Sequence, residues 1–278
     1  MLFASTDLAA RVERAECRLL TDGAAAASER LRDETVFVQP IAAGVAVFAV
    51  AGSPLNKLAG LGFGGAVDEE ELAQIERVFA ERKVPLQVEL SNLADPSVGA
   101  LLTGRGYTLE GFENVLGRAL PTDSLSPVDE RIRVTRSNPG ELAAWIDVIV
   151  TAFAAPDTQG VASHESFERK ILEEAIADMA AAEAFERYSA RLDGELAGGA
   201  SMRMFEGIAQ LTGAATLPDK RRRGVQSALL STRLAHASRR GCDLAVVTTQ
   251  PGSKSHENVQ RQGFELLYTR AVLVRAGN

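Results

Sequence analysis

The chain has 278 residues, of which 46% are hydrophobic and 24% charged, and its formal net charge is −7. This composition is typical of a soluble globular protein, the length fits two domains, and the acidic balance argues against general nucleic-acid binding. No apolar run approaches the roughly 20 residues that span a bilayer. The first residues lack the basic start and apolar core of a signal peptide, and Cys17 and Cys242 form no disulfide framework. We therefore expect a cytoplasmic protein that does not bind membranes.

The first half of the chain is predicted to alternate helices and strands. Thr6 or Asp7 can cap a first helix whose apolar stripe includes Leu8 and Val12. Apolar periodicity predicts helices at about 8–19, 24–32, 68–82 and 96–104. Runs of apolar and β-branched residues predict strands at 35–38, 45–50, 86–90 and, as one or two strands, 107–120.

The segment 120–128 has the composition of a linker, and a second alternation of strands and helices follows it. Asp193-Gly194 between two apolar runs predicts a hairpin. Strands are expected at 131–135, 185–192, 198–205, 207–215 and 243–249, and from residue 264 onward. Helices are expected at 141–153, 164–181 and 254–262, and in the segment after Gly224.

The two halves match each other at a constant offset of 157 residues. Arg105-Gly106-Tyr107 aligns with Gln262-Gly263-Phe264, and the segment 115–118 aligns with 272–275. Such an ungapped series indicates an internal duplication, although two generic α/β segments can also match in this way by coincidence.

The stretch 216–230 carries the strongest chemical signal. It follows a predicted strand, precedes a helical pattern, and contains Arg221, Arg222 and Arg223 directly before Gly224. The first N–H groups of a helix lack intrahelical partners and lie at the positive end of the helix dipole, so a phosphate or pyrophosphate is their natural ligand. Glycine lets the backbone approach closely, and the arginines add charge and donors. The simpler alternative is a basic helix start that faces solvent.

This pattern, Pro218-x-x-Arg221-x-x-Gly224-x-Gln226, resembles the acyl-CoA pyrophosphate loop of the GCN5-related N-acetyltransferases, the GNAT family, with glutamine in place of the usual final small residue. The segment 255–264 resembles the family's helix ahead of a Gly-Phe pair. Its polar side chains could bond the pantetheine arm or the phosphates, and helix capping explains them equally well. The cofactor-binding residues that the resemblance implies are Thr216, Leu217, Arg221, Arg222, Arg223, Gly224, Val225, Gln226, Ser227, Ser255 and Asn258.

The resemblance implies an α/β fold with a mixed sheet, built as two tandem GNAT-like domains at 1–122 and 129–278. In this family two central strands splay apart, and the pantetheine arm pairs with the free edge of the strand before the loop, here 212–217. At the 157-residue offset the loop falls on 64–69, which has no arginine, and the carboxylates at 68–71 would repel a pyrophosphate. We therefore expect 1–122 to be degenerate and to support the substrate site, and 129–278 to bind acyl-CoA and to be catalytic.

Direct acyl transfer needs a neutral amine near the thioester carbon, a backbone N–H of the splayed strand to polarise the carbonyl, and groups that move protons. Many family members carry a tyrosine acid where this chain has Val259. We expect Tyr268 as the acid and Glu206 as the base, although a packed tyrosine and a solvated turn glutamate are the simpler interpretations. His256 is expected to face water and Cys242 to fill core space, and no spacing indicates a metal. The region that lines the acceptor site in relatives contains Asp157, His164 and Glu165.

These features predict an N-acyltransferase that uses acyl-CoA, with acetyl-CoA as the expected co-substrate. The expected acceptor is the primary amine of a small molecule, and a protein or peptide amine is left open. One alternative is an acyl-CoA-binding pseudoenzyme or sensor without transferase activity. Another is a nucleic-acid or nucleotide binder that uses the loop arginines with Arg239 and Arg240, which the net charge disfavours. No motif encodes the oligomeric state, and a homodimer is left open.

Overall fold

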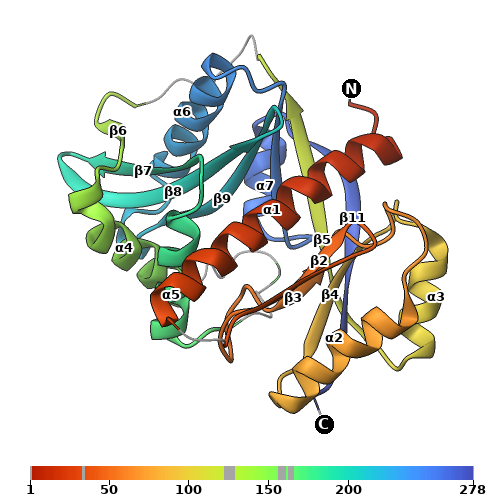
Figure 1. The fold of residues 1–278 in the computed structure, drawn as a ribbon. Helices are drawn as coiled ribbons and strands as arrows, with labels where there is room; N and C mark the ends of the chain where they lie inside the picture. Colours follow the sequence, from red (N-terminus) through yellow and green to blue (C-terminus); the bar gives the residue numbers. More distant parts are fainter. Residues whose placement is uncertain (1, 33–34, 122–128, 156–160, 162–165, 278) are drawn as a thin grey trace. The chain divides into compact units, whose positions relative to one another are not determined.

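The computed structural model describes residues 2–32, 35–121, 129–155, 161 and 166–277. The chain divides into two compact units (Figure 1). We call the unit formed by Met1–Leu2 and Leu116–Glu265 the loop unit, because it contains the arginine-rich loop. We call the unit formed by Phe3–Val115 and Leu266–Asn278 the α1 unit, after its first helix.

The α1 unit is built on the strand order β1-β2-β3-β4-β11-β5, with β3 and β4 parallel. Its helix α1 is continuous from Thr6 to Leu31, where two helices were expected, because the buried Gly23 lies within the helix without breaking it. Ser5 caps α1 by accepting a hydrogen bond from the Leu8 N–H at 3.1 Å. Its elements are α1 (Thr6–Leu31), β1 (Phe37–Ile41), β2 (Gly44–Phe48), β3 (Lys57–Ala59), α2 (Glu69–Glu81), β4 (Leu86–Ser91), α3 (Pro96–Gly104) and most of β5 (Thr108–Ala119) and β11 (Glu265–Arg275).

The loop unit has the strand order β10-β9-β8-β7-β6, with the last residues of β5 beside β10. β9 and β10 are parallel, and the pairs β8–β9, β7–β8 and β6–β7 are antiparallel. Its elements are β6 (Ile132–Arg136), a 3-10 turn (Pro139–Glu141), α4 (Leu142–Ala154), α5 (Arg169–Ala180), β7 (Phe185–Leu192), β8 (Glu195–Phe205), β9 (Ile208–Thr216), a second 3-10 turn (Pro218–Lys220), α6 (Val225–Arg239), β10 (Leu244–Thr249) and α7 (Lys254–Arg261). The predicted α/β fold with mixed strand directions is confirmed.

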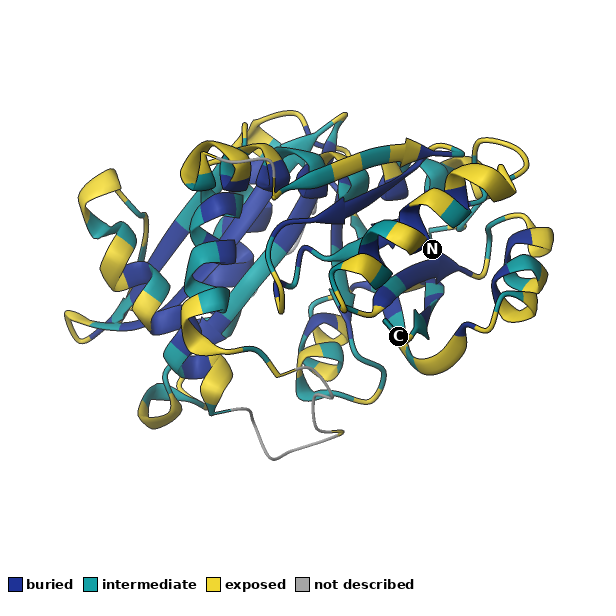
Figure 2. Cartoon of the chain, turned by 60° about the horizontal axis from the view of Figure 1, so that its bottom comes forward, coloured by how far each residue is buried: buried dark blue, intermediate teal, exposed yellow. Residues whose placement is uncertain are grey.

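Two consecutive glycines of β8 let helices approach both faces of the sheet in the loop unit. A Cβ at Gly198 would lie 2.9 Å from Val225 Cγ1 of α6, and one at Gly199 would lie 2.8 Å from Trp145 Nε1 of α4. Successive strand residues point to opposite faces, so α6 and α4 cover opposite sides. Figure 2 shows most of the central strands buried and the outer sides of the helices exposed. The arrangement fixes the first turn of α6 against the middle of the sheet.

The bounds of the elements agree with the offset that relates the two halves. Moved by 157 residues, α2, β4, α3 and β5 each begin and end within one residue of α6, β10, α7 and β11. β3 moved in the same way ends at Thr216, the last residue of β9. The agreement over five elements supports duplication rather than coincidence.

The two units differ from the expected division at 122–129 in their final strands. β11, the last strand of the chain, pairs antiparallel with β4, so Leu266–Asn278 belongs to the α1 unit. The end of β5, Leu116–Ala119, belongs to the loop unit, where the Leu120 N–H donates to the Asp243 carbonyl at 2.8 Å. The end of β5, from the first half of the sequence, thus belongs to the loop unit, and nearly all of β11, from the second half, belongs to the α1 unit. An apolar strand pattern looks the same whichever sheet the strand joins, so the sequence did not reveal this exchange.

Candidate functional site

The arginine-rich loop adopts a backbone that favours glycine at the start of α6. Arg222 and Gly224 have φ angles of +60° and +85°, both in the left-handed region. Gly224 is the N-cap of α6 and supplies no side-chain hydrogen bond to the first N–H groups of the helix. These N–H groups, at the positive end of a 15-residue helix, are therefore free of a competing side-chain cap. This is the local geometry of an anion site.

The three arginines of the loop have different surroundings. Arg221 turns inward and donates to the carbonyls of Ala152 at 3.1 Å, of Thr216 at 3.3 Å, and of Ala155. It ties the loop to the carboxyl end of α4, where the helix dipole favours a cation. Arg222 and Arg223 are exposed and available to a ligand. The structure thus gives Arg221 a supporting role and leaves the side chains of the other two exposed.

An open strand edge leads into the loop. The parallel register of β9 with β10 covers Ile208–Leu211 and Leu244–Val247 and ends there. β9 continues to Thr216, beyond the pair of Leu211 with Val247, so the register with β10 does not extend over its last five residues. The free edge expected at 212–217 is present up to the end of β9. It lies directly before the loop in the sequence.

The remaining candidates for cofactor binding lie at the end of β9 and in the first two turns of α6 and α7. The Asn258 side-chain amide donates to the Gln226 side chain at 2.9 Å, so the structure brings these two candidates together. Ser227 is half-buried on α6, and Ser255 is exposed on α7. Val225 is buried and packs in the core, and Thr216 and Leu217 are half-buried at the end of β9. The predicted cofactor residues therefore all lie in one unit.

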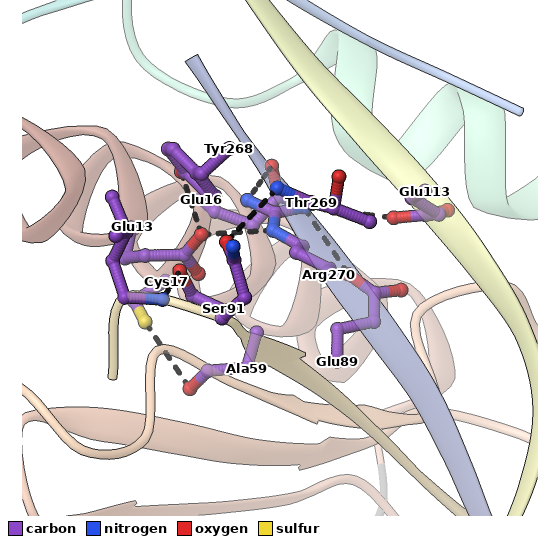
Figure 3. Close-up of polar contacts among 12 residues, drawn as sticks. Glu13, Glu16, Cys17, Ala59, Glu89, Ser91, Glu113, Tyr268, Thr269 and Arg270 are labelled. Carbon is purple, nitrogen blue, oxygen red and sulfur yellow. Dashed lines mark hydrogen bonds and ion pairs between the residues drawn. The ribbon is translucent and has the colours of Figure 1, made fainter. Parts of the chain in front are cut away.

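The surroundings of the two predicted catalytic side chains do not suit the roles expected of them. Tyr268 belongs to the α1 unit, is 3% exposed, and donates its hydroxyl to Glu13 Oε1 at 2.7 Å (Figure 3). Burial raises the pKa of Tyr268 well above its ordinary value, with the Glu13 charge as a second cause. A buried phenol that already donates to a carboxylate does not suit proton delivery to a thiolate, so the assignment of Tyr268 as the acid does not fit the structure.

Glu206 lies in the turn between β8 and β9, where its φ is +46°. It precedes Thr212, the first residue beyond the β9–β10 register, by six residues. Six residues of strand cover about 20 Å, so this carboxylate is remote from the open edge along β9. The prediction of Glu206 as the base is therefore also at odds with the geometry, because a base must come within hydrogen-bond reach of the amine.

Three of the other polar candidates lie outside the described residues, and a fourth, His256, is half-buried. Asp157, His164 and Glu165 lie outside the described residues. His256 was expected to face water, but its Nδ1 accepts the Gly252 N–H at 3.2 Å, and its Nε2 is buried without a hydrogen-bond partner among the described residues. Within the described ranges, no group of three or more His, Cys, Asp or Glu side chains could hold a metal ion. No helix in those ranges is both long and apolar enough for a membrane span.

Sequence reasoning missed the buried charges of the loop unit, among them Arg233. Arg233 is 3% exposed on the face of α6 that also carries Leu229 and Leu234. The available signal was a charged residue at the helical spacing of an apolar stripe, where a leucine or alanine is usual.

Comparisons with known proteins agree with this geometry. The acetyltransferase (GNAT) family model matches residues 149–264, which contain β9, the loop and α7. A GCN5-related N-acetyltransferase from Kribbella flavida is 20% identical, with 92% of this chain and 96% of that chain covered and a TM-score of 0.63. A tandem GNAT protein from the clavulanic acid biosynthesis pathway is 12% identical, with 100% of this chain and 97% of that chain covered and a TM-score of 0.62.

A GCN5-related N-acetyltransferase from Sphaerobacter thermophilus is 18% identical, with 95% of this chain and 92% of that chain covered and a TM-score of 0.57. At these identities the structural likeness establishes the fold and not the substrate. A search of curated proteins found no match. The family match identifies residues 149–264 as an acetyltransferase (GNAT) domain, and the chain as a whole shares its fold with GCN5-related N-acetyltransferases and with a tandem GNAT protein.

Proposed function

We propose that the loop unit binds acetyl-CoA and transfers the acetyl group directly to the primary amine of a small molecule. The match of residues 149–264 to the GNAT family supports acyl-CoA-dependent N-acyl transfer in general. The acetyl group, the small acceptor and the individual binding residues are the parts of this statement that we propose.

The juxtaposition of an uncapped helix start with an open strand edge supports the proposal most directly. The diphosphate of the cofactor would accept hydrogen bonds from the first N–H groups of α6, with Arg222 and Arg223 neutralising its charge. The amides of the pantetheine arm would pair with β9 after Leu211, where the register with β10 ends. One ligand with a diphosphate and a peptide-like arm satisfies both features.

The chemistry that follows is a single acyl exchange. The amine nitrogen attacks the thioester carbon, a C–N bond forms, the C–S bond breaks, the amine loses a proton and the thiolate gains one. Holding both reactants in place supplies much of the rate. We propose His256 as the donor to the thiolate, because an Nδ1 that accepts the Gly252 N–H leaves the proton of the neutral ring on Nε2. α7, which carries His256, follows β10 directly.

The deciding experiment combines binding with turnover. Calorimetry of the full chain with acetyl-, propionyl- and succinyl-CoA measures which acyl group binds, and a thiol-release assay with a panel of small amines and a lysine peptide measures transfer. We expect tightest binding of acetyl-CoA and thiol release with at least one small amine. Absence of binding by every acyl-CoA would refute the proposal.

One observation favours an alternative, an acyl-CoA-binding sensor without transferase activity. The position of the usual tyrosine acid is the buried Val259, and the surroundings of Tyr268 and Glu206 do not suit the roles predicted for them. Tight binding of acetyl-CoA without thiol release for any amine, peptide or water would support this alternative. Substitution of His256 by glutamine separates the two functions further, since only an enzyme would lose kcat while keeping its affinity for acetyl-CoA.

A further inference from the structure

Arg233 is a buried cation without a carboxylate partner among the described residues. Its guanidinium donates to three backbone carbonyls: Ser201 at 2.8 Å, Leu229 at 3.3 Å and Thr212 at 3.4 Å. Burial lowers the pKa of Arg233 to about 10, which leaves the side chain charged at neutral pH. Burying a charge that only carbonyl dipoles compensate costs stability, and a leucine at this position of α6 would avoid that cost.

Two of the carbonyls that hold Arg233, those of Ser201 and Thr212, belong to a β-bulge between β8 and β9. Gly199 pairs with Ala215 and Ser201 with Thr212, so the register shifts and β9 contains an extra residue. Gly213 has a φ of +54°, and a Cβ there would lie 2.9 Å from Ser201 Oγ. The bulge therefore needs glycine, and it begins at the first residue of β9 beyond the β10 register.

The hydrogen bonds at the bulge fix the direction of one peptide plane. The Thr212 carbonyl accepts from Ser201 Oγ at 3.0 Å and from Arg233. In a trans peptide the C=O and the following N–H point in opposite directions, so the Gly213 N–H points away from Ser201 and Arg233. β8 lies on one side of β9 and β10 on the other. The Gly213 N–H is thus directed away from the Ser201 side chain and from Arg233, at the start of the part of β9 that lies beyond its register with β10.

We propose that Arg233 is a positioning residue for acyl transfer: it orients the Thr212–Gly213 peptide and polarises it, so that the Gly213 N–H is held as the donor to the thioester oxygen. A cation on the carbonyl oxygen draws charge across the peptide and makes its N–H a stronger donor. Negative charge develops on the thioester oxygen as the amine attacks, and a preorganised donor stabilises it. The inference rests on the proposed acyl transfer at this strand.

Three variants separate the charge from the packing. Arg233→Met keeps the length of the side chain and removes the charge, Arg233→Lys keeps the charge, and Arg239→Met removes an exposed arginine from the end of the same helix as the matched control. We expect Arg233→Met to lower kcat about tenfold or more, Arg233→Lys to recover part of it, and Arg239→Met to change it less than twofold. The KM for acetyl-CoA should stay within about twofold in all three, since the acyl oxygen is a small part of the ligand.

An NMR measurement reports directly on the Thr212–Gly213 peptide. Labelling threonine carbonyls with 13C and glycine nitrogens with 15N selects only the Thr-Gly peptides, and the chain has two, Thr103–Gly104 and Thr212–Gly213. We expect the Gly213 amide signal to move upfield in Arg233→Met and the Gly104 signal to stay. If Arg233→Met does not fold, Ser201→Ala removes the other donor to the same carbonyl and should produce a smaller shift in the same direction.

The outcomes distinguish this inference from the proposed function. A wild-type protein that neither binds acetyl-CoA nor releases thiol would refute the proposed function and the role of Arg233 with it. A wild-type protein that turns over, beside an Arg233→Met variant of unchanged kcat per folded enzyme and unchanged Gly213 signal, would overturn the inference alone and leave Arg233 a structural residue.

Discussion

Tyr268 and Glu13 lie 255 residues apart in the sequence and share a hydrogen bond of 2.7 Å in the core of the α1 unit. The bond joins β11, the last strand of the chain, to α1, its first helix. Glu13 Oε1 also accepts from Arg270 Nε at 2.8 Å, so two residues of β11 donate hydrogen bonds to the same carboxylate oxygen (Figure 3). The pair therefore has a structural explanation that is independent of catalysis.

Replacing Tyr268 by phenylalanine tests this explanation. The variant loses a hydrogen bond to a buried carboxylate, which costs about 1.5–3 kcal/mol, and its melting temperature should fall by several degrees. Its kcat should equal that of the wild type at a temperature where both are folded. A Tyr268→Phe variant with wild-type stability that had lost most of its kcat would show that Tyr268 takes part in catalysis.

Charges around Arg270 make the stability of the α1 unit depend on pH in two opposite ways. Burial raises the pKa of Glu13 above its ordinary value, against the effect of Arg270. Burial alone would also raise the pKa of Glu89, but the charges of Lys57 and Arg270 outweigh it and the pKa is lowered. Arg270 Nη1 lies 3.3 Å from Glu89, and Glu16 and Glu113 approach the same guanidinium at 3.9 and 3.7 Å.

Glutamine at position 13 or 89 should separate these effects. A raised folded-state pKa contributes stability below the ordinary value of 4.5 and loses it as the pH rises, so Glu13→Gln should gain stability relative to wild type between pH 5 and pH 8. A lowered folded-state pKa contributes stability above 4.5 and loses it as the pH falls, so the cost of Glu89→Gln should shrink below pH 4.5. At neutral pH the cost of Glu89→Gln should reach about 3–5 kcal/mol, because the buried cations Lys57 and Arg270 lose the carboxylate that they share.

Urea unfolding of the three proteins at pH 3.5, 5 and 8 measures both trends. A Glu89→Gln cost that does not change with pH would show that this carboxyl is not ionised in the folded protein. A Glu13→Gln variant that loses stability relative to wild type as the pH rises would reverse the sign given to Glu13.

Local signals in the sequence predicted the parts of the fold that local chemistry decides. Asp193-Gly194 forms the turn of the β7–β8 hairpin, with φ angles of +52° and +87° at the two positions. Gly224 begins α6, and Pro96 begins α3. Each of these residues acts within a few positions of itself, through backbone angles and a first helical turn.

The parts that could not be predicted depend on partners far along the chain. β11 pairs with β4, which comes from the other half of the sequence. An alternating apolar pattern does not indicate which strand a segment will pair with. Tyr268 has the residue type of an acid, and only the position of Glu13 shows what its hydroxyl does. Arg233 was overlooked for the same reason, since its role depends on carbonyls of β8 and β9.

The loop arginines should separate into one structural and two ligand-binding residues. Arg221→Gln removes the donors to Ala152 and Thr216, so its melting temperature should fall, with a cost of about 1–3 kcal/mol. The double variant Arg222→Gln, Arg223→Gln should keep wild-type stability and bind CoA about tenfold more weakly at low salt. That difference in affinity should shrink at about 0.5 M salt, where screening weakens exposed charges. Equal affinity of the double variant and the wild type for CoA at low salt would show that neither Arg222 nor Arg223 contributes to binding.

Gly224→Glu should abolish acetyl-CoA binding, because it places a carboxylate at the helix start where the diphosphate would bind. The φ of +85° strains any side chain there, so the variant also loses about 1–2 kcal/mol of stability. Gly241→Glu is the matched control: its φ is +80°, no atom lies within 4 Å of the added Cβ, and it lies just beyond the other end of α6. Calorimetry should find binding in Gly241→Glu and none in Gly224→Glu, and binding in both would exclude this helix start as the diphosphate site.

One acetyl-CoA should bind per chain, because the α1 unit lacks both features of the proposed site. Its counterpart of the loop leads into α2, whose N-cap Asp68 already accepts from the N–H groups of Glu70 at 2.8 Å and Glu71 at 3.1 Å. The acidic first turn would repel a diphosphate.

The strand edge in this unit is closed as well. Leu58 and Ala59, which match Ala215 and Thr216 at the 157-residue offset, pair with Val88 and Glu89 of β4, so no gap corresponds to the one after Leu211. Calorimetry of the full chain should therefore give a stoichiometry of one, and Gly224→Glu should reduce it to zero. A stoichiometry of two, or one that persists in Gly224→Glu, would place cofactor binding in the α1 unit and contradict its degeneracy.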